Sequence, residues 1–464
     1  MTAELDLARR VVDMARTAAG ADAQAEVLVN HTELALTRFA NSYIHQNVAD
    51  ATTTVRLRVH VDGRTVAGST TLADPDGLAA LVARTLDAAK LCPPDPGWPG
   101  LAPPTPLAGA GAWDEATAHA GPGDRAERVR AFVAAAGGSE TAGYCRTVYL
   151  AAGFANSAGQ AITGQASEAA MDAVARVAGS DGVARLASAR LADIDGAILG
   201  SRAAAKARAG REPVELPPGR YEVVLEPTAV ADILQHLSQY GFDGRAYLDR
   251  RSFVSLGERQ FDPSITIVDD PLGVTGLGLP FDADGTPKQA LTLVAAGITR
   301  EVAHDRRTAA EAGAASTGHA VPGASWPGPH PVNPRIESAT GGPATAADGI
   351  AHGPAADAGT AALLAGVERG LLVTDFWYTR MLDPRSLVVT GLTRNGVWLV
   401  ERGEITAAVR DLRFTQSYPR ALAEGGVRQI GPSTTTVPNT WEMAWWTAPA
   451  LHLAAWNFTG GASG

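Results

Sequence analysis

The sequence predicts an α+β protein with two domains: helices packed on a sheet, followed by a domain of mainly antiparallel strands. Three observations support this class. One-sided apolar helices accompany alternating strand patterns in residues 1–214, strand patterns dominate residues 215–464, and 50 glycines and 29 prolines imply many turns. The strand-rich half is compatible with a barrel-like closure. At 464 residues, 45% of them hydrophobic, the chain is long enough to bury a sizeable core.

The N-terminal domain begins with a helix and continues with strands. Residues 4–19 place their apolar side chains on one helical face. Two strands are expected to meet at a turn at Asn41-Ser42, and Val55–Val61 alternates strictly between apolar and polar residues. Asp74 and Pro75 open a second helix. Residues 92–107 are too rich in proline for regular structure and predict an extended connector.

The domain boundary is placed near residue 215. The alanine-rich segment 186–210 predicts the last helix of the N-terminal domain. In the C-terminal domain, Glu222–Pro227 fits a strand that leads into a helix capped by Thr228. Asn395-Gly396 and Arg402-Gly403 predict hairpin turns between later strands.

Composition excludes several classes of protein. The formal net charge of -10 argues against a nucleic acid or an acidic membrane as a partner held by charge. Cys92 and Cys145 form no CxxC pair and suit a reducing compartment. The first residues lack the apolar core of a signal peptide, and no apolar run reaches membrane-spanning length. We therefore expect a cytoplasmic protein without a membrane or nucleic-acid partner.

The first helix of the C-terminal domain lacks the residues of a zinc site. Its only histidine is His236, followed by Leu237, whereas a zinc peptidase helix needs two His on one face and a Glu. A lone His there is usually a hydrogen-bonded packing residue. An alternative metal site would have to combine His236 and His319 with a distant carboxylate such as Asp243 or Asp249.

The chain resembles the TldD/PmbA family, and the PmbA (TldE) branch in particular. The TldD branch carries His-Glu-x-x-x-His in this helix and a late cysteine ligand, and this sequence has neither. The blocks that carry the resemblance run in family order over nearly the whole chain: Arg38–Asn47, Val55–Leu72, Gly153–Gly159, Tyr247–Gly257, Pro280–Pro287, Ser316–Ala320, Gly370–Trp377, Gly396–Ile405 and Pro449–Gly460.

The resemblance implies a non-catalytic subunit of a TldD–TldE metalloprotease that processes peptides and unfolded segments. The zinc is then expected in a TldD-like partner, and no residue of this chain is assigned as a catalyst or a metal ligand. His236 and His319 remain candidates for contact with substrate. For His319 the reason is that the family places the Ser316–Ala320 block toward the cavity. Two alternatives stay open: a stand-alone hydrolase of the family, and a homo-oligomeric peptide-binding module without catalysis.

Overall fold

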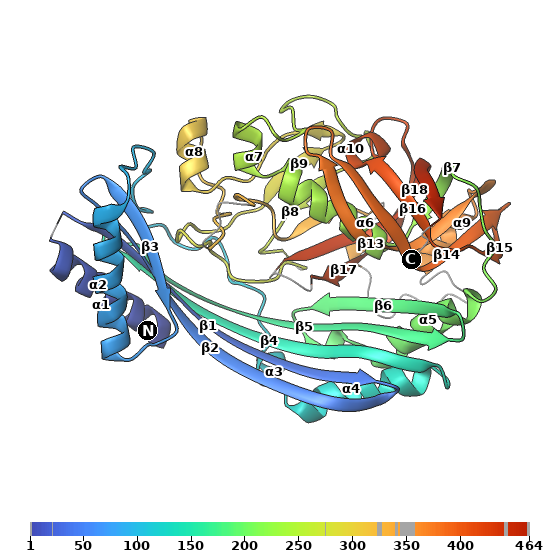
Figure 1. Cartoon of the computed structure of the whole chain (residues 1–464), viewed down its shortest axis with the longest axis horizontal. Coiled ribbons are helices and arrows are strands. Elements are labelled where there is room, and N and C mark those ends of the chain that lie inside the picture. The colour runs from blue at the N-terminus through green and yellow to red at the C-terminus, as the bar shows by residue number, and fades with distance from the viewer. Residues whose placement is uncertain are drawn as a thin grey trace.

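Two sheets organise the described part of the chain, an N-terminal one of six strands and a C-terminal one of twelve (Figure 1). The computed structural model describes residues 2–20, 22–273, 275–322, 327–338, 342–343, 358–439 and 444–461. The N-terminal sheet is a long curved ribbon, and the C-terminal domain lies over one of its faces (Figure 1). The predicted α+β class is confirmed.

The N-terminal sheet has six antiparallel strands in the order β3-β2-β1-β4-β5-β6. Its longest hairpin joins β1 to β2 through Asn41 and Ser42, whose φ angles of 50° and 63° make the tight turn predicted there. The strands are β1 (Gln24–Ala40), β2 (Tyr43–Val61), β3 (Arg64–Thr70), β4 (Glu140–Asn156), β5 (Ala161–Val177) and β6 (Ser180–Ser188).

Helices cover this sheet in two groups. At one end, α1 (Ala3–Ala19) and α2 (Pro75–Leu91) bury apolar residues against β1 and β2, and Asp74 caps α2 as predicted. Gly153 on β4 lets the first turn of α1 approach closely, because a side chain there would meet the backbone of Leu5. At the other end lie α3 (Glu115–Ala118), α4 (Pro122–Ala135), the 3₁₀ turn η1 (Leu191–Asp193) and α5 (Gly196–Ala209).

The C-terminal sheet is mixed but mainly antiparallel. A pairing between its strands β7 and β18 closes part of it into a ring with β13, β14 and β16. Its strands are β7 (Gly219–Leu225), β8 (Ile267–Asp269), β9 (Leu291–Ala295), β10 (Ile298–Thr299), β11 (Pro334–Ile336), β12 (Gly342–Pro343), β13 (Arg369–Asp383), β14 (Val388–Glu401), β15 (Glu404–Ala408), β16 (Leu412–Ser417), β17 (Val427–Pro438) and β18 (Trp445–Gly461).

The largest core of the molecule lies in this domain. Apolar residues of α6 pack there against the ring strands, with Trp456, Phe376 and Phe414 in mutual ring contact. The helical segments are α6 (Pro227–His236), a π-helical turn (Leu237–Gly241), α7 (Gly244–Leu248), α8 (Arg306–Ala312), α9 (Ala358–Leu364) and α10 (Tyr418–Ala421).

Three local predictions are wrong. Asn395 and Gly396 are not a hairpin turn: β14 continues through them, and their positive φ angles of 60° and 130° belong to an irregularity in its pairing with β13. Residues 186–188 extend β6, so helix α5 starts only at Gly196. Thr228 does not cap α6, because Glu226 holds the N-cap position and Pro227 opens the first turn.

Buried ion pairs join the two domains. Lys206 on α5 reaches Glu226 at the start of α6, with 2.5 Å between Nζ and Oε2, and both side chains are almost fully buried. Arg185 on β6 pairs with Asp375 on β13 at 2.7 Å. Breaking a buried ion pair is costly, so these contacts stabilise the docking of the two domains.

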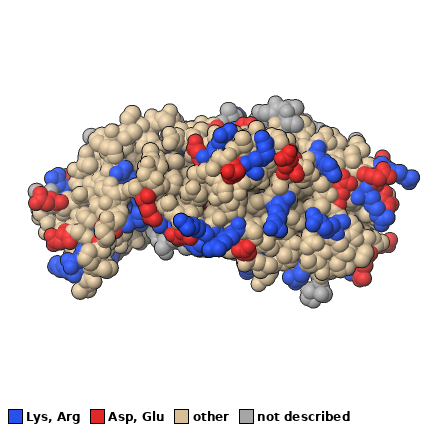
Figure 2. Space-filling view, turned by 90° about the horizontal axis from the view of Figure 1, so that it is seen from above, with Lys and Arg blue, Asp and Glu red and all other residues tan. Residues whose placement is uncertain are grey.

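The surface carries both signs of charge. Acidic and basic side chains are interspersed along the face drawn in Figure 2. That pattern differs from the continuous basic surface that binds a phosphate backbone. Among the described residues, no helix combines the length and apolar character needed to cross a bilayer.

Candidate functional site

His236 lies in the core of the C-terminal domain. Strand β7 runs directly into α6, which ends at His236 itself before the π-helical turn. The residue is only 6% exposed. Its Nδ1 lies 2.9 Å from the backbone oxygen of Asp232 and 3.5 Å from the Oδ2 of that residue. Because a carbonyl oxygen can only accept, Nδ1 carries the proton and donates it to the helix backbone.

Asp232 is the centre of a small polar cluster. The hydroxyl of Thr379 donates to its Oδ1 at 2.7 Å, and the hydroxyl of Tyr418 donates to its Oδ2 at 2.6 Å. Burial and the neighbouring Asp232 carboxylate raise the pKa of Tyr418 well above its ordinary value. The imidazole of His236 stacks on Tyr240 and meets the ring of Tyr418 edge-on. The cluster therefore ties α6 to β13 and α10.

The residues of this cluster do not fit a zinc ion. One imidazole and one carboxylate are too few ligands for a tetrahedral site. In the described part of the chain, no three His, Cys, Asp or Glu side chains gather in a metal-binding arrangement. The two distant carboxylates have other partners: Asp243 caps α7 and accepts from the backbone of Gly328, and Asp249 pairs with Arg251 at 3.0 Å.

His319 lies in a second, separate cluster. Its Nε2 is 2.9 Å from Oδ2 of Asp269, and both side chains are fully buried. Its Nδ1 is 2.8 Å from the hydroxyl of Thr317, and the other oxygen of Asp269 accepts from the backbone N–H of Asn333. Both ring nitrogens are thus engaged inside the fold. The structure does not bring His236 and His319 together, and their contact with substrate stays a prediction.

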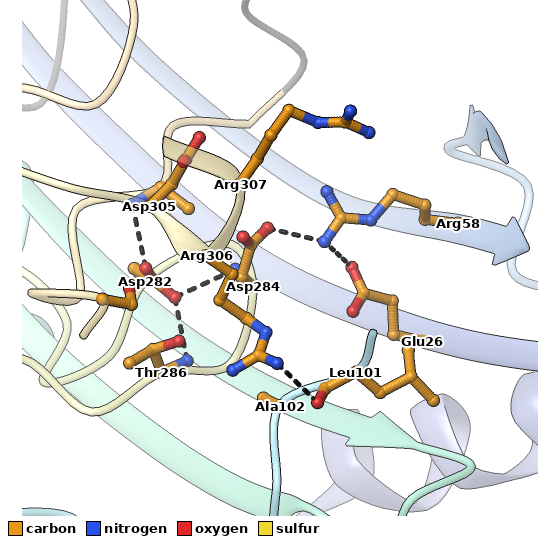
Figure 3. Close-up of polar contacts among 12 residues, drawn as sticks. Glu26, Arg58, Leu101, Ala102, Asp282, Asp284, Thr286, Asp305, Arg306 and Arg307 are labelled. Carbon is orange, nitrogen blue, oxygen red and sulfur yellow. Dashed lines mark hydrogen bonds and ion pairs between the residues drawn. The ribbon is translucent and has the colours of Figure 1, made fainter. Parts of the chain in front are cut away.

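A third cluster joins the two domains, and sequence reasoning did not find it. On adjacent strands β1 and β2, Arg58 pairs with Glu26, and its Nη2 also reaches Oδ1 of Asp284 at 2.7 Å (Figure 3). Glu26 is 4% exposed and Asp284 6%. Burial raises the pKa of Glu26 to about 8, against the opposing effect of Arg58. The Oε2 of Glu26 has no hydrogen-bond partner among the described residues.

The turn that carries Asp284 is organised by Asp282. One carboxylate oxygen of Asp282 accepts from the backbone N–H groups of Asp284 and Thr286, and the other accepts from that of Ala320 at 2.9 Å. Burial, followed by the charge of Asp284, raises the pKa of Asp282 to about 7. Because Ala320 follows His319 in the chain, this turn links the interdomain cluster to the histidine cluster.

Two arginines at the start of α8 hold the proline-rich connector predicted for residues 92–107. Arg306 donates to the backbone oxygen of Leu101 at 2.8 Å (Figure 3), and Arg307 makes two contacts of 2.9 and 2.6 Å with the carboxylate of Asp95. Hydrogen bonds from Arg307 hold the pKa of Asp95 well below its ordinary value. The connector is therefore bound to the C-terminal domain.

A polar groove of about 1000 Å³ opens elsewhere along the domain boundary. It is lined by the β5–β6 turn, by the linker before β7 and by the irregular part of β14. Its charged lining includes Arg176, Asp181, Arg394, Arg410 and Asp411, of which Arg176 and Asp181 form a bidentate pair at 2.6 and 2.8 Å. Acids and bases are balanced there, which suits a ligand with both donors and acceptors.

Comparison with protein families gives two matches in chain order. The PmbA/TldA metallopeptidase C-terminal domain matches residues 218–460, which is more than half of the chain. The PmbA/TldA metallopeptidase domain 1 matches residues 25–89. No curated protein matches the sequence.

Solved structures share the fold over nearly the whole chain. TldE from Thermococcus kodakarensis is 17% identical with a TM-score of 0.83, covering 98% of this chain and 100% of that one. A proposed modulator of DNA gyrase from Thermotoga maritima is 18% identical with a TM-score of 0.79, covering 98% and 99%. One from Bacteroides thetaiotaomicron is 19% identical, also at 0.79, covering 98% of each chain. On the match to its C-terminal domain and domain 1, this chain belongs to the PmbA/TldA (TldD/PmbA) metallopeptidase family.

Proposed function

We propose that this chain is the TldE-type, non-catalytic subunit of a cytoplasmic TldD–TldE zinc metalloprotease that degrades or trims peptides and unfolded segments. One observation carries the proposal. The helix in which the TldD branch bears His-Glu-x-x-x-His holds a single histidine here, His236, and its Nδ1 is bound to the backbone of its own helix. A hydrolytic zinc needs three protein ligands and a water that a nearby base can activate.

The polar groups around α6 support a structural role for that helix. Asp232, the carboxylate beside His236, accepts hydrogen bonds from the hydroxyl groups of Thr379 and Tyr418, so both of its oxygens are engaged within the fold. The zinc and the catalytic base are therefore assigned to the TldD-like partner, and this subunit is assigned the task of completing the enzyme around it.

Reconstitution from purified subunits tests the proposal. The chain is mixed with the TldD-like protein of the same organism, and cleavage of an unfolded polypeptide is followed by mass spectrometry. We expect cleavage by the mixture and none by this chain alone. Replacing the histidines of the partner's motif should abolish cleavage, whereas His236→Asn in this chain should leave it intact whenever the variant folds.

Two results would contradict the proposal and favour the alternatives. Chelator-sensitive cleavage by the solitary chain would make it a stand-alone hydrolase. Binding of unfolded peptide without cleavage, both alone and in the mixture, would make it a peptide-binding module.

A further inference from the structure

Strand β2 is paired on one side over most of its length and unpaired on the other. It pairs with β1 from Tyr43 to His60, but with β3 only from Val55 to Val61. Residues 43–54 therefore form a bare edge of the N-terminal sheet. Apart from the ladder with β1, no backbone hydrogen bond joins this stretch to any other described residue.

The phase of the ladder shows which groups face outward. Val61 and Arg64 flank a two-residue turn whose members, Asp62 and Gly63, have φ angles of 49° and 70°. In a two-residue hairpin the residues that flank the turn are hydrogen-bonded to each other, so the N–H and C=O of Val61 point toward β3. Along β2 the direction of the N–H and C=O groups then alternates from one residue to the next, toward β3 and toward β1. Counting back along β2, the N–H and C=O groups that point away from β1 are those of Asn47, Ala49, Ala51 and Thr53.

This edge has few of the features that normally protect a bare strand: its one irregularity in pairing with β1 lies near the hairpin, between Ile44 and Gln46. Its sequence, YIHQNVADATTT, contains one charged residue, Asp50, and no lysine, arginine or proline. Most of its side chains are exposed, including Tyr43 at 59%. Natural proteins blunt exposed edges with charges, prolines, bulges or a covering segment, because a bare edge is a template for pairing with another chain. The opposite case is β3, a short edge strand against which α2 packs.

We propose that residues 43–54 of β2 pair, antiparallel, with the equivalent edge of the TldD-like catalytic subunit, so that two six-stranded sheets become one of twelve strands. This inference rests on the proposed function. An extended run of this length spans about 40 Å, long enough to fix the register of a subunit interface.

The shape and composition of the edge favour a folded subunit over a substrate peptide. The sheet is strongly curved along β2 (Figure 1), and a partner built on the same fold brings an edge of matching curvature. Such a partner also covers the edge permanently, which an aggregation-prone strand with a single charge requires. A substrate peptide would cover the edge only during turnover and would leave its own outer edge bare.

Proline substitutions test the pairing without touching the ladder to β1. In the double variant Ala49→Pro, Ala51→Pro, each lost N–H is one that points outward, where edge strands tolerate proline. Ala67→Pro is the matched control, because Ala67 is exposed on β3 and its N–H also points away from the sheet. All proteins are first shown to fold by circular dichroism, and their affinity for the TldD-like subunit is then measured. We expect the edge variant to bind at least about tenfold more weakly and the control to bind like the wild type.

Hydrogen exchange of the wild-type complex gives a readout that a folding defect cannot imitate. The amides of Ala49, Ala51 and Thr53 should exchange rapidly in the isolated chain and become protected when the partner binds. If the complex forms while these amides stay unprotected, or the edge variant binds normally, the pairing is refuted and the proposed function stands. If the wild type binds no TldD-like subunit, the proposed function fails. Protection by peptide alone, or by a second copy of this chain, would overturn the assigned occupant.

Discussion

Replacing Glu26 with glutamine tests the interdomain cluster through its pH dependence. A glutamine side chain has nearly the same shape as a protonated glutamate. It also keeps one oxygen that can accept a hydrogen bond from Arg58. In the folded chain burial raises the pKa of Glu26 to about 8, against an ordinary value of 4.5. Between these values the folded state therefore holds a proton that the unfolded state has released, so the stability of the wild type falls as pH rises through this window.

The size of the effect follows from the width of the window. One pH unit of difference in pKa corresponds to about 1.4 kcal/mol, so the range from 4.5 to about 8 corresponds to about 5 kcal/mol. Near pH 5 the glutamine variant should match the wild type within about 1 kcal/mol. Near pH 8.5 it should be the more stable protein by about 3 to 5 kcal/mol. Asp282 titrates in both proteins, so the difference between them isolates Glu26.

Urea denaturation at the two pH values, followed by tryptophan fluorescence, measures this difference. Glu140→Gln is the control, because Glu140 is an exposed carboxylate on β4 of the same sheet and its change should be within about 0.5 kcal/mol at either pH. A glutamine variant less stable than the wild type near pH 8.5 would refute the reasoning. It would mean that Glu26 is ionised in the folded chain and that its pairing with Arg58 outweighs the cost of burial.

Three further predictions follow from the buried groups. Tyr418→Phe removes a hydroxyl donor from Asp232 and should lower the free energy of unfolding by about 1–3 kcal/mol in urea denaturation, and an unchanged midpoint would contradict the hydrogen bond. His319→Leu strips Asp269 of a buried partner and should cost about 3–5 kcal/mol; unchanged stability together with lost peptide binding would instead make His319 a substrate contact. Burial raises the pKa of the Cys145 thiol to about 12, so iodoacetamide should modify Cys145 only after denaturation, as peptide mass spectrometry would show.

Sequence reasoning worked where the signal is local. Asp74 before Pro75 predicts a cap and a first turn, and α2 begins there because both preferences act within one turn of helix. Asn41-Ser42 likewise sets its own left-handed turn. Asn395-Gly396 has the same local chemistry but a different outcome, because β14 pairs with β13 on both sides of it, at Arg394 and at Val397, so the strand continues through the irregularity.

The clusters depend on contacts that no local pattern encodes. Asp284 meets Arg58 across 226 residues of sequence, and His319 meets Asp269 across 50. A sequence scan registers these residues only as charges in loops or strands, and their burial becomes visible once both domains are folded and docked. The signal present in the sequence is the pair of acids in PFDADGTP, in a turn bounded by proline and glycine.

The metal content of the solitary chain tests the central claim most directly. The protein is expressed with excess zinc, purified without chelator, dialysed against metal-free buffer and measured by inductively coupled plasma mass spectrometry. Far less than one zinc per chain is predicted, because the α6 cluster offers one imidazole whose neighbours are already bonded. One tightly held zinc per chain, removed by a chelator together with peptide cleavage, would contradict the account.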